Sequence, residues 1–190
     1  MITWYDIANY GLAVTVLLGS MPLWVSIYQF SLVGIHSHVN HYPKCKPFFP
    51  KVSIMVPAWN EAPVLDTTIE LLMDMDYPLN ALRIYIIDDA STDNTPELMQ
   101  EKMQQYPGNV FHLRRKKGGE GKAHTLNFGI REAVKDGWTE ALLIMDADVL
   151  FEKSSLRRMA RHLVDPKVGA VTAYIKAVSY THLRAHETRY

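Results

Sequence analysis

The stretch KVSIMVPAWNEAPVLDTTIELLMDMDYPLNALRIYIIDDASTD, residues 51–93, decides the fold. It opens with a short run rich in β-branched residues that ends at Pro57, and a second apolar run covers residues 82–87. Between these runs, residues 63–75 carry apolar side chains at helical spacing, namely Val64, Leu65, Ile69, Leu72 and Met75. A strand, a helix and a second strand in this order predict a parallel βαβ unit.

The same alternation continues along the chain. We predict further helices over 96–106, 125–135 and 154–164, and further strands over 110–113, 141–145 and 168–174. The strand ALLIM (141–145) is entirely apolar, which favours a place at the centre of the sheet. The expected fold is α/β, a Rossmann-like and mostly parallel sheet with flanking helices, over residues 51–177.

A nearly uncharged leader precedes this domain. Residues 1–43 contain one formally charged side chain, Asp6, and the 29 residues from Ile7 to Ile35 contain no Asp, Glu, Lys, Arg or His. A helix needs about 20 mostly apolar residues to cross a bilayer. We therefore predict a transmembrane segment at 1–36 and a juxtamembrane linker at 37–50. A cleaved signal peptide, which has a basic start and a shorter apolar core, and a buried helix of a soluble protein are the alternatives.

The basic residues that follow the leader predict its orientation. Lys44, Lys46 and Lys51 come after the apolar segment, and no Lys or Arg precedes it. The positive-inside rule then places the C-terminal domain in the cytoplasm, behind a single span in the inner or plasma membrane.

Charge and cysteine content exclude several classes of protein. The 39 charged residues after the leader are 20 basic and 19 acidic, so the domain lacks the bulk positive charge that binds polyanions, and we expect no nucleic-acid partner. A single cysteine, Cys45, excludes a disulfide framework and a zinc site built from cysteines.

Polar side chains follow four successive predicted strands. In open α/β sheets ligands bind outside the carboxyl ends of the strands. The candidate binding residues are those at these strand ends: Pro57, Ala58, Asn60, Glu61, Asp88, Asp89, Gly121, Lys122, Asp146 and Asp148. Polar residues at four strand ends of one sheet predict a single site.

Two of these groups suggest specific chemistry. Asp146 and Asp148 are two residues apart, which in an extended chain places both carboxylates on one face, and carboxylates with phosphate oxygens hold Mg²⁺ or Mn²⁺. Two solvated turn acids are the alternative. Gly121-Lys122, in a glycine-rich loop before a helix, suits a phosphate. Neither the Walker A pattern nor G-x-G-x-x-G is present, which speaks against an ATPase or an NAD enzyme.

The ordered set of motifs resembles the family 2 glycosyltransferases, whose catalytic domain has the GT-A fold. The matching stretches, in the family's order, are VSIMVPAWNE (52–61), IIDDASTD (86–93), GKAHTLNFG (121–129) and MDADV (145–149). Together with the leader, they are most similar to membrane-bound synthases of the cellulose, hyaluronan and poly-N-acetylglucosamine type. The resemblance covers about two-thirds of the chain and implies transfer of a sugar from a nucleotide donor, UDP-linked, to a glycan or lipid-linked acceptor.

The resemblance also implies residue roles. Pro57, Ala58, Asn60 and Glu61 would line the nucleotide pocket, and Asp88 and Asp89 would include the carboxylate that reads the uracil ring. Gly121 and Lys122 would lie against the diphosphate, and Asn127 would support their loop. Asp146 would approach the ribose or sugar and the metal, and Asp148 would ligate the metal, which stabilises the leaving diphosphate as a Lewis acid.

The family's catalytic base is missing from the sequence. Neither the downstream Glu-Asp pair nor Gln-x-x-Arg-Trp follows Asp148, and residues 178–190 match no family motif. We therefore expect an N-terminal fragment that holds the donor-binding half, ending in a non-native tail. The alternatives are a non-catalytic, membrane-tethered nucleotide-sugar binder and a nucleotidyltransferase, although the latter needs a glycine- and arginine-rich loop where residues 57–61 stand.

Overall fold

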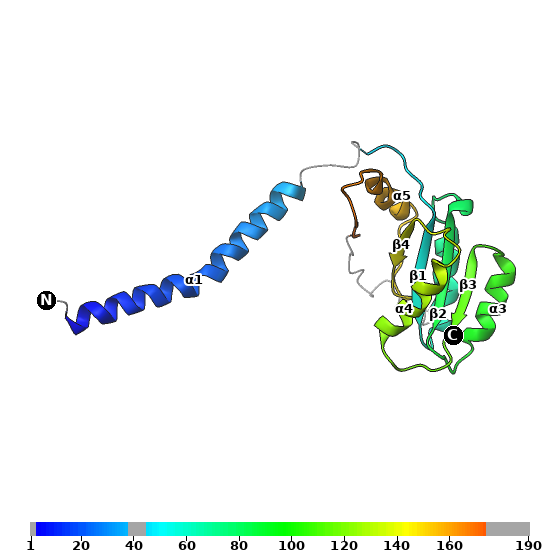
Figure 1. The fold of residues 1–190 in the computed structure, drawn as a ribbon, viewed down its shortest axis with the longest axis horizontal. Coiled ribbons are helices and arrows are strands. Elements are labelled where there is room, and N and C mark those ends of the chain that lie inside the picture. Colours follow the sequence, from blue (N-terminus) through cyan, green and yellow to red (C-terminus); the bar gives the residue numbers. More distant parts are fainter. Residues whose placement is uncertain (1–2, 38–44, 174–190) are drawn as a thin grey trace, which may run out of the picture. The chain divides into compact units, whose positions relative to one another are not determined.

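The computed structural model describes residues 3–37 and 45–173 (Figure 1). The chain divides into two units, Met1–Lys44 and Cys45–Tyr190.

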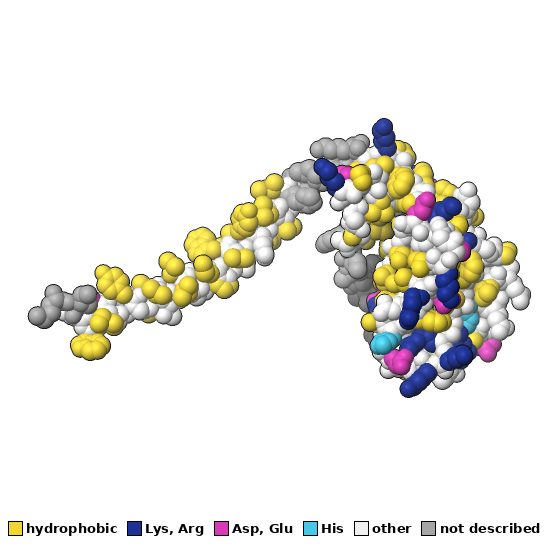
Figure 2. Space-filling view, in the orientation of Figure 1, with side chains coloured by type: hydrophobic (Ala, Val, Ile, Leu, Met, Phe, Trp, Pro, Cys, Tyr) yellow, Lys and Arg dark blue, Asp and Glu magenta, His cyan; other side chains and the backbone are white. Residues whose placement is uncertain are grey.

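The first unit contains one long helix, α1 (Trp4–Ser37). Thr3 and Asp6 cap its start: the Thr3 hydroxyl donates to the Asp6 carboxylate (2.7 Å), and the Asp6 N–H donates to the Thr3 hydroxyl (3.2 Å). Hydrophobic side chains lie along its whole length (Figure 2). Its 34 residues span about 51 Å at 1.5 Å per residue. By length and composition, the part from Trp4 to Ile35 could cross a membrane.

Over residues 45–173, the second unit is built on a parallel sheet of four strands in the order β3-β2-β1-β4. The strands are β1 (Val52–Ala58), β2 (Leu82–Asp88), β3 (Val110–Arg114) and β4 (Ala141–Ile144). The helices are α2 (Ala62–Met73), α3 (Thr95–Gln105), α4 (Lys122–Ala133) and α5 (Ser155–Ala160), with 3₁₀ turns η2 (Leu79–Ala81) and η3 (Arg161–Val164). The predicted α/β fold with a parallel sheet is confirmed.

Side chains alternate between the two faces of the sheet, as period-2 geometry requires. Ile54, Val56 and Ile84 belong to the larger core, which also contains residues of α2, α3 and α5. Met55, Tyr85 and Ile87 point the other way and pack with α4. Helices therefore cover both faces, and every strand runs toward the same edge of the sheet.

Two strand predictions were wrong in part. β4 is an edge strand among the described residues rather than a central one, and its Leu142 and Ile144 are 42% and 51% exposed. In the parallel register these two side chains lie opposite Ser53 and Met55, on the face of the sheet that α4 covers. Neither of them belongs to the cluster of side chains that packs with α4. Residues 168–173 of the predicted last strand form no strand. Instead, Val168–Val171 line an apolar cleft of about 660 Å³ that Ala141–Leu143 also line.

The apolar sequence of residues 141–145 was misleading, because apolar side chains indicate that a strand prefers to be buried. They do not show whether a further strand pairs with it in the sheet. The remaining residue of the predicted strand at 168–174, Tyr174, and the predicted non-native tail at 178–190 lie outside the described residues.

Candidate functional site

The carboxyl ends of β1, β2 and β4 and the start of α4 surround one cavity of about 360 Å³. Seven of the eleven residues singled out from the sequence line it: Pro57, Ala58, Glu61, Asp89, Lys122, Asp146 and Asp148. Trp59, Thr125 and Ala147 complete the wall. Four stretches that are distant in sequence thus meet at one place. What each side chain binds stays a prediction.

Asn60 lies off the cavity wall and joins two loops instead. Its backbone is left-handed (φ 56°), a conformation that asparagine tolerates better than most residues. Its side-chain oxygen accepts hydrogen bonds from the N–H groups of Thr92 (2.8 Å) and Asp93 (3.3 Å), and its own N–H donates to the Ser91 hydroxyl (3.0 Å). Asn60 therefore fixes the loop after β1 against the loop after β2, and Trp59 beside it is 63% exposed at the cavity.

The two adjacent acids after β2 have different surroundings. Asp88 is fully buried and lies off the cavity wall, where it accepts from the Ser91 N–H (2.7 Å) and contacts His112 Nε2 at 3.2 Å. Asp89 lines the cavity. Burial raises the pKa of Asp89, but hydrogen bonds from the Gly119 N–H, the Thr125 hydroxyl and the Arg115 guanidinium outweigh it and hold the pKa below its ordinary value.

Arg114, the last residue of β3, and Arg115 after it hold loops together and do not line the cavity. Arg114 donates to the Ser91 carbonyl (2.8 Å), and Arg115 pairs with Asp89 and Glu120. Gly118 packs so closely on the chain at Asp89 that an added Cβ would lie 2.1 Å from the Asp89 carbonyl oxygen. The glycine-rich loop therefore packs closely against Asp89.

Gly121 and Asn127 also lie off the wall. Gly121 takes a positive φ of 91° just before α4 begins at Lys122, and its carbonyl accepts from the N–H groups of His124 (3.0 Å) and Thr125 (3.3 Å). Asn127 is exposed on α4, where its carbonyl accepts from Arg131 (3.1 Å). Thr125, which the sequence did not single out, bonds to Asp89 (3.0 Å) and so links α4 to the end of β2.

The Asp-x-Asp segment forms a turn rather than an extended strand end. The Val149 N–H donates to the Asp146 carbonyl (3.2 Å), which reverses the chain after β4. The hydroxyl of Thr68, buried on α2, donates to the Ala147 carbonyl at 2.6 Å. Ala147 is buried while Asp146 and Asp148 are exposed, so the turn presents both carboxylates to the cavity.

The donor set of this turn fits a hard divalent cation. Asp146 and Asp148 offer oxygen ligands on one cavity wall, as Mg²⁺ and Mn²⁺ prefer. Within residues 3–37 and 45–173, no group of three or more His, Cys, Asp or Glu side chains is placed to hold a metal ion. A cation at this turn would therefore need phosphate oxygens or water to complete its coordination. Lys122 forms an ion pair with Asp146 across the cavity.

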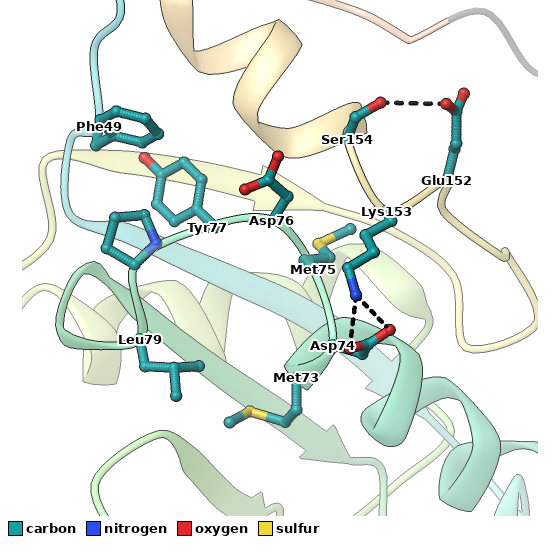
Figure 3. A pocket seen from close by; sticks show the side chains of 11 residues that line it. Phe49, Met73, Asp74, Met75, Asp76, Tyr77, Leu79, Glu152, Lys153 and Ser154 are labelled. Carbon is teal, nitrogen blue, oxygen red and sulfur yellow. Dashed lines mark hydrogen bonds and ion pairs between the residues drawn. The ribbon is translucent and has the colours of Figure 1, made fainter.

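A larger cavity of about 790 Å³ lies at the other end of α2, next to the segment before α5 (Figure 3). Its three carboxylates have partners: Asp74 pairs with Lys153 (2.9 Å), Asp76 with Arg157 (2.8 Å), and Glu152 accepts from the Ser154 hydroxyl (3.1 Å). These contacts join α2 to the chain that follows the Asp-x-Asp turn. We assign this cavity a structural role.

The model of the family described as "Glycosyl transferase family 2" matches residues 53–189. Among curated proteins, the β-monoglucosyldiacylglycerol synthase of Synechocystis sp. is 34% identical over 124 residues, which cover 65% of this chain and 25% of that protein. The probable glycosyltransferase YdaM of Bacillus subtilis is 30% identical, covering 83% of this chain and 39% of YdaM. The poly-β-1,6-N-acetyl-D-glucosamine synthase of Staphylococcus epidermidis is 30% identical, covering 80% of this chain and 37% of the synthase.

A solved structure has a similar fold. The mannosyltransferase PcManGT of Pyrobaculum calidifontis, in complex with GDP-Man and Mn²⁺, superposes with a TM-score of 0.70 at 27% identity, covering 86% of this chain and 47% of that chain. This chain spans between about a quarter and two-fifths of the length of the curated relatives it matches.

Proposed function

The chain belongs to glycosyl transferase family 2, and from that premise we propose that its Cys45–Tyr190 unit binds a nucleotide-sugar donor for transfer to a glycan or lipid acceptor. The observation that carries the proposal is the convergence of Glu61, Asp89, Lys122, Asp146 and Asp148 on one cavity at the carboxyl edge of a parallel sheet. These residues come from four separate stretches of the chain, and the cavity combines oxygen ligands for a cation with an ammonium group for phosphate.

Each residue has a role that its position suits. Asp148 and Asp146 hold Mg²⁺ or Mn²⁺, and Asp146 also faces the ribose or sugar. Lys122 contacts the diphosphate, Glu61 lies near the nucleoside, and Asp89 accepts from the base, for which we propose uracil. Three further residues support the site indirectly, because they fix the loops that carry these groups: Asn60, Asp88 and Thr125. A divalent cation held by Asp146 and Asp148 would supply Lewis-acid stabilisation of the negative charge on the leaving diphosphate.

The reaction joins an acceptor oxygen to the anomeric carbon of the donor sugar while the bond from that carbon to the diphosphate breaks. The acceptor hydroxyl must lose its proton to a base. After Asp148, the described acids Glu152 and Asp165 are not on the cavity wall. We therefore propose that the base comes from the part of the full-length protein that lies beyond the described residues. A unit that binds the donor without turning it over is the second candidate, and this same observation favours it.

We propose that α1 anchors the protein and that the following unit lies in the cytoplasm, because Lys44, Lys46 and Lys51 follow the apolar segment. Two of the similar curated proteins are named as synthases of a glucosyldiacylglycerol and of poly-N-acetylglucosamine, and these products support a lipid or a growing glycan as the acceptor.

Calorimetry tests the donor site. We expect the full chain in detergent to bind UDP more tightly with Mn²⁺ than without it, and Asp148→Ala to lower the Mn²⁺-dependent affinity about tenfold or more. Glu152→Ala is the matched control, because it removes an exposed carboxylate outside the cavity.

The proposal fails if a folded wild-type chain binds no UDP, or if both variants behave alike. GDP titrated in parallel tests the uracil assignment. Adding UDP-sugar and following released UDP separates the two candidates, because a binding unit without its base releases none.

A further inference from the structure

The ammonium group of Lys122 lies at the Asp-x-Asp turn, next to a carboxylate that could otherwise bind a metal ion. Lys122 is the first residue of α4, and its Nζ donates to Oδ1 of Asp146, the second residue after β4. The two side chains are 54% and 53% exposed and both line the cavity. A carboxylate oxygen that accepts from an ammonium group is less available as a ligand to a metal ion.

The position of Lys122 makes this contact specific. The start of a helix carries partial positive charge, which disfavours a lysine there unless an anion is close. Gly121, with φ 91°, starts the 12-residue helix α4 abruptly at Lys122. Asp146 supplies the anion in the structure, and a diphosphate in the cavity would supply a second one.

We propose that Lys122 is an internal counter-ion that makes cation binding depend on the nucleotide diphosphate. This inference rests on the proposed function. Without nucleotide, the ammonium group stays on Asp146 and competes with the divalent cation. With nucleotide, it moves to a phosphate oxygen and leaves Asp146 free as a ligand. Because coupling between two binding sites is reciprocal, the cation strengthens nucleotide binding by the same factor.

The expected change in cation affinity follows from the solvent exposure of the ion pair between Lys122 and Asp146. Ion pairs between exposed side chains are weak and change an equilibrium constant by up to about fivefold. The pair can therefore exchange partners readily, and its loss should strengthen binding of the cation alone by about two- to fivefold. The same substitution should weaken the enhancement that UDP gives.

Electron paramagnetic resonance of free Mn²⁺, on the full chain in detergent, measures the affinity with and without UDP. We expect Lys122→Gln to bind Mn²⁺ alone about two- to fivefold more tightly than wild type, with a smaller gain on adding UDP. Lys122→Arg should keep the wild-type order. Lys153→Gln is the matched control, since it removes one exposed lysine–aspartate pair, with Asp74, away from this cavity.

Equal Mn²⁺ affinity in Lys122→Gln and Lys153→Gln, with UDP-enhanced binding intact in both, overturns the counter-ion role and leaves the proposed function standing. If wild type shows no Mn²⁺ binding even with UDP, or Asp148→Ala keeps it, the proposed function and this inference fail together. Thermal unfolding of each variant shows whether it is folded.

Discussion

Thr68 illustrates how a single buried hydroxyl can support the site without touching its cavity. Its hydroxyl group donates to the Ala147 carbonyl at 2.6 Å, in the middle of the Asp-x-Asp turn. We expect Thr68→Val to lower the free energy of unfolding by about 1–3 kcal/mol, because the buried carbonyl loses its donor. Mn²⁺-dependent UDP binding should weaken as well. The neighbouring Thr67→Val, at an exposed position, is the control for denaturant unfolding and calorimetry, and equal effects would contradict this role.

Asp89 gives a prediction about pH. Because its folded pKa is depressed, the stabilisation it provides is complete above the pKa of the unfolded chain, about 3.9. It is lost as the pH falls through the lower, folded value. Asp89→Asn should therefore destabilise the protein by about 1–3 kcal/mol at pH 7 and by much less at pH 3. Unfolding at both pH values tests this, with Asp165→Asn as the exposed control; a difference independent of pH would be inconsistent with it.

At the scale of elements, α4 lies against β2 through Gly129. A Cβ on Gly129 would approach Ile87 Cγ1 and Cδ1 to 2.5 and 2.2 Å. Gly129→Ala should therefore cost about 1–3 kcal/mol of stability through overpacking. Ile87→Val removes Cδ1, so the double variant should recover part of the loss. Denaturant midpoints of the two single variants and the double variant measure this coupling, and strictly additive losses would count against the contact.

The sequence predicted the helices and strands themselves better than it predicted which strands lie side by side in the sheet. Alternation of apolar runs with helical patterns was enough for the parallel sheet, because each βαβ unit is a local feature. The edge position of β4 was missed, since an apolar strand looks the same whether or not a further strand pairs with it.

The sequence predicted that the candidate site lies at the ends of the strands. It did not predict which side chains at those ends line the cavity. Asp88 and Asp89 are adjacent and chemically identical, yet one is buried beneath the loops and the other lines the cavity. Trp59 lay between two residues that were singled out, and its exposed aromatic ring was the signal that could have found it. Thr125 and Thr68 carried no such signal, because their contacts depend on how α4 and α2 pack.

At the scale of the whole molecule, the proposed topology can be tested through the single cysteine. Cys45→Ser with Lys117→Cys would place one thiol on an exposed loop of the second unit. We expect a membrane-impermeant maleimide to leave intact cells unlabelled and to label the thiol after permeabilisation. Labelling of intact cells would place the unit outside the membrane, against the orientation that the lysines predict.

The separation of core from cavity affects how such a protein can diverge. Ile54, Val56, Ile84 and Ile86 hold the sheet to its helices, whereas the cavity wall comes largely from the turns and the helix start that follow the strands. Substitutions at Trp59 or Glu61 would therefore leave the packing of the sheet nearly unchanged. Asn60 constrains this freedom, because its left-handed backbone holds two of those turns together. If the cavity binds the proposed donor, a lineage could thus exchange one donor for another without first acquiring a more stable scaffold.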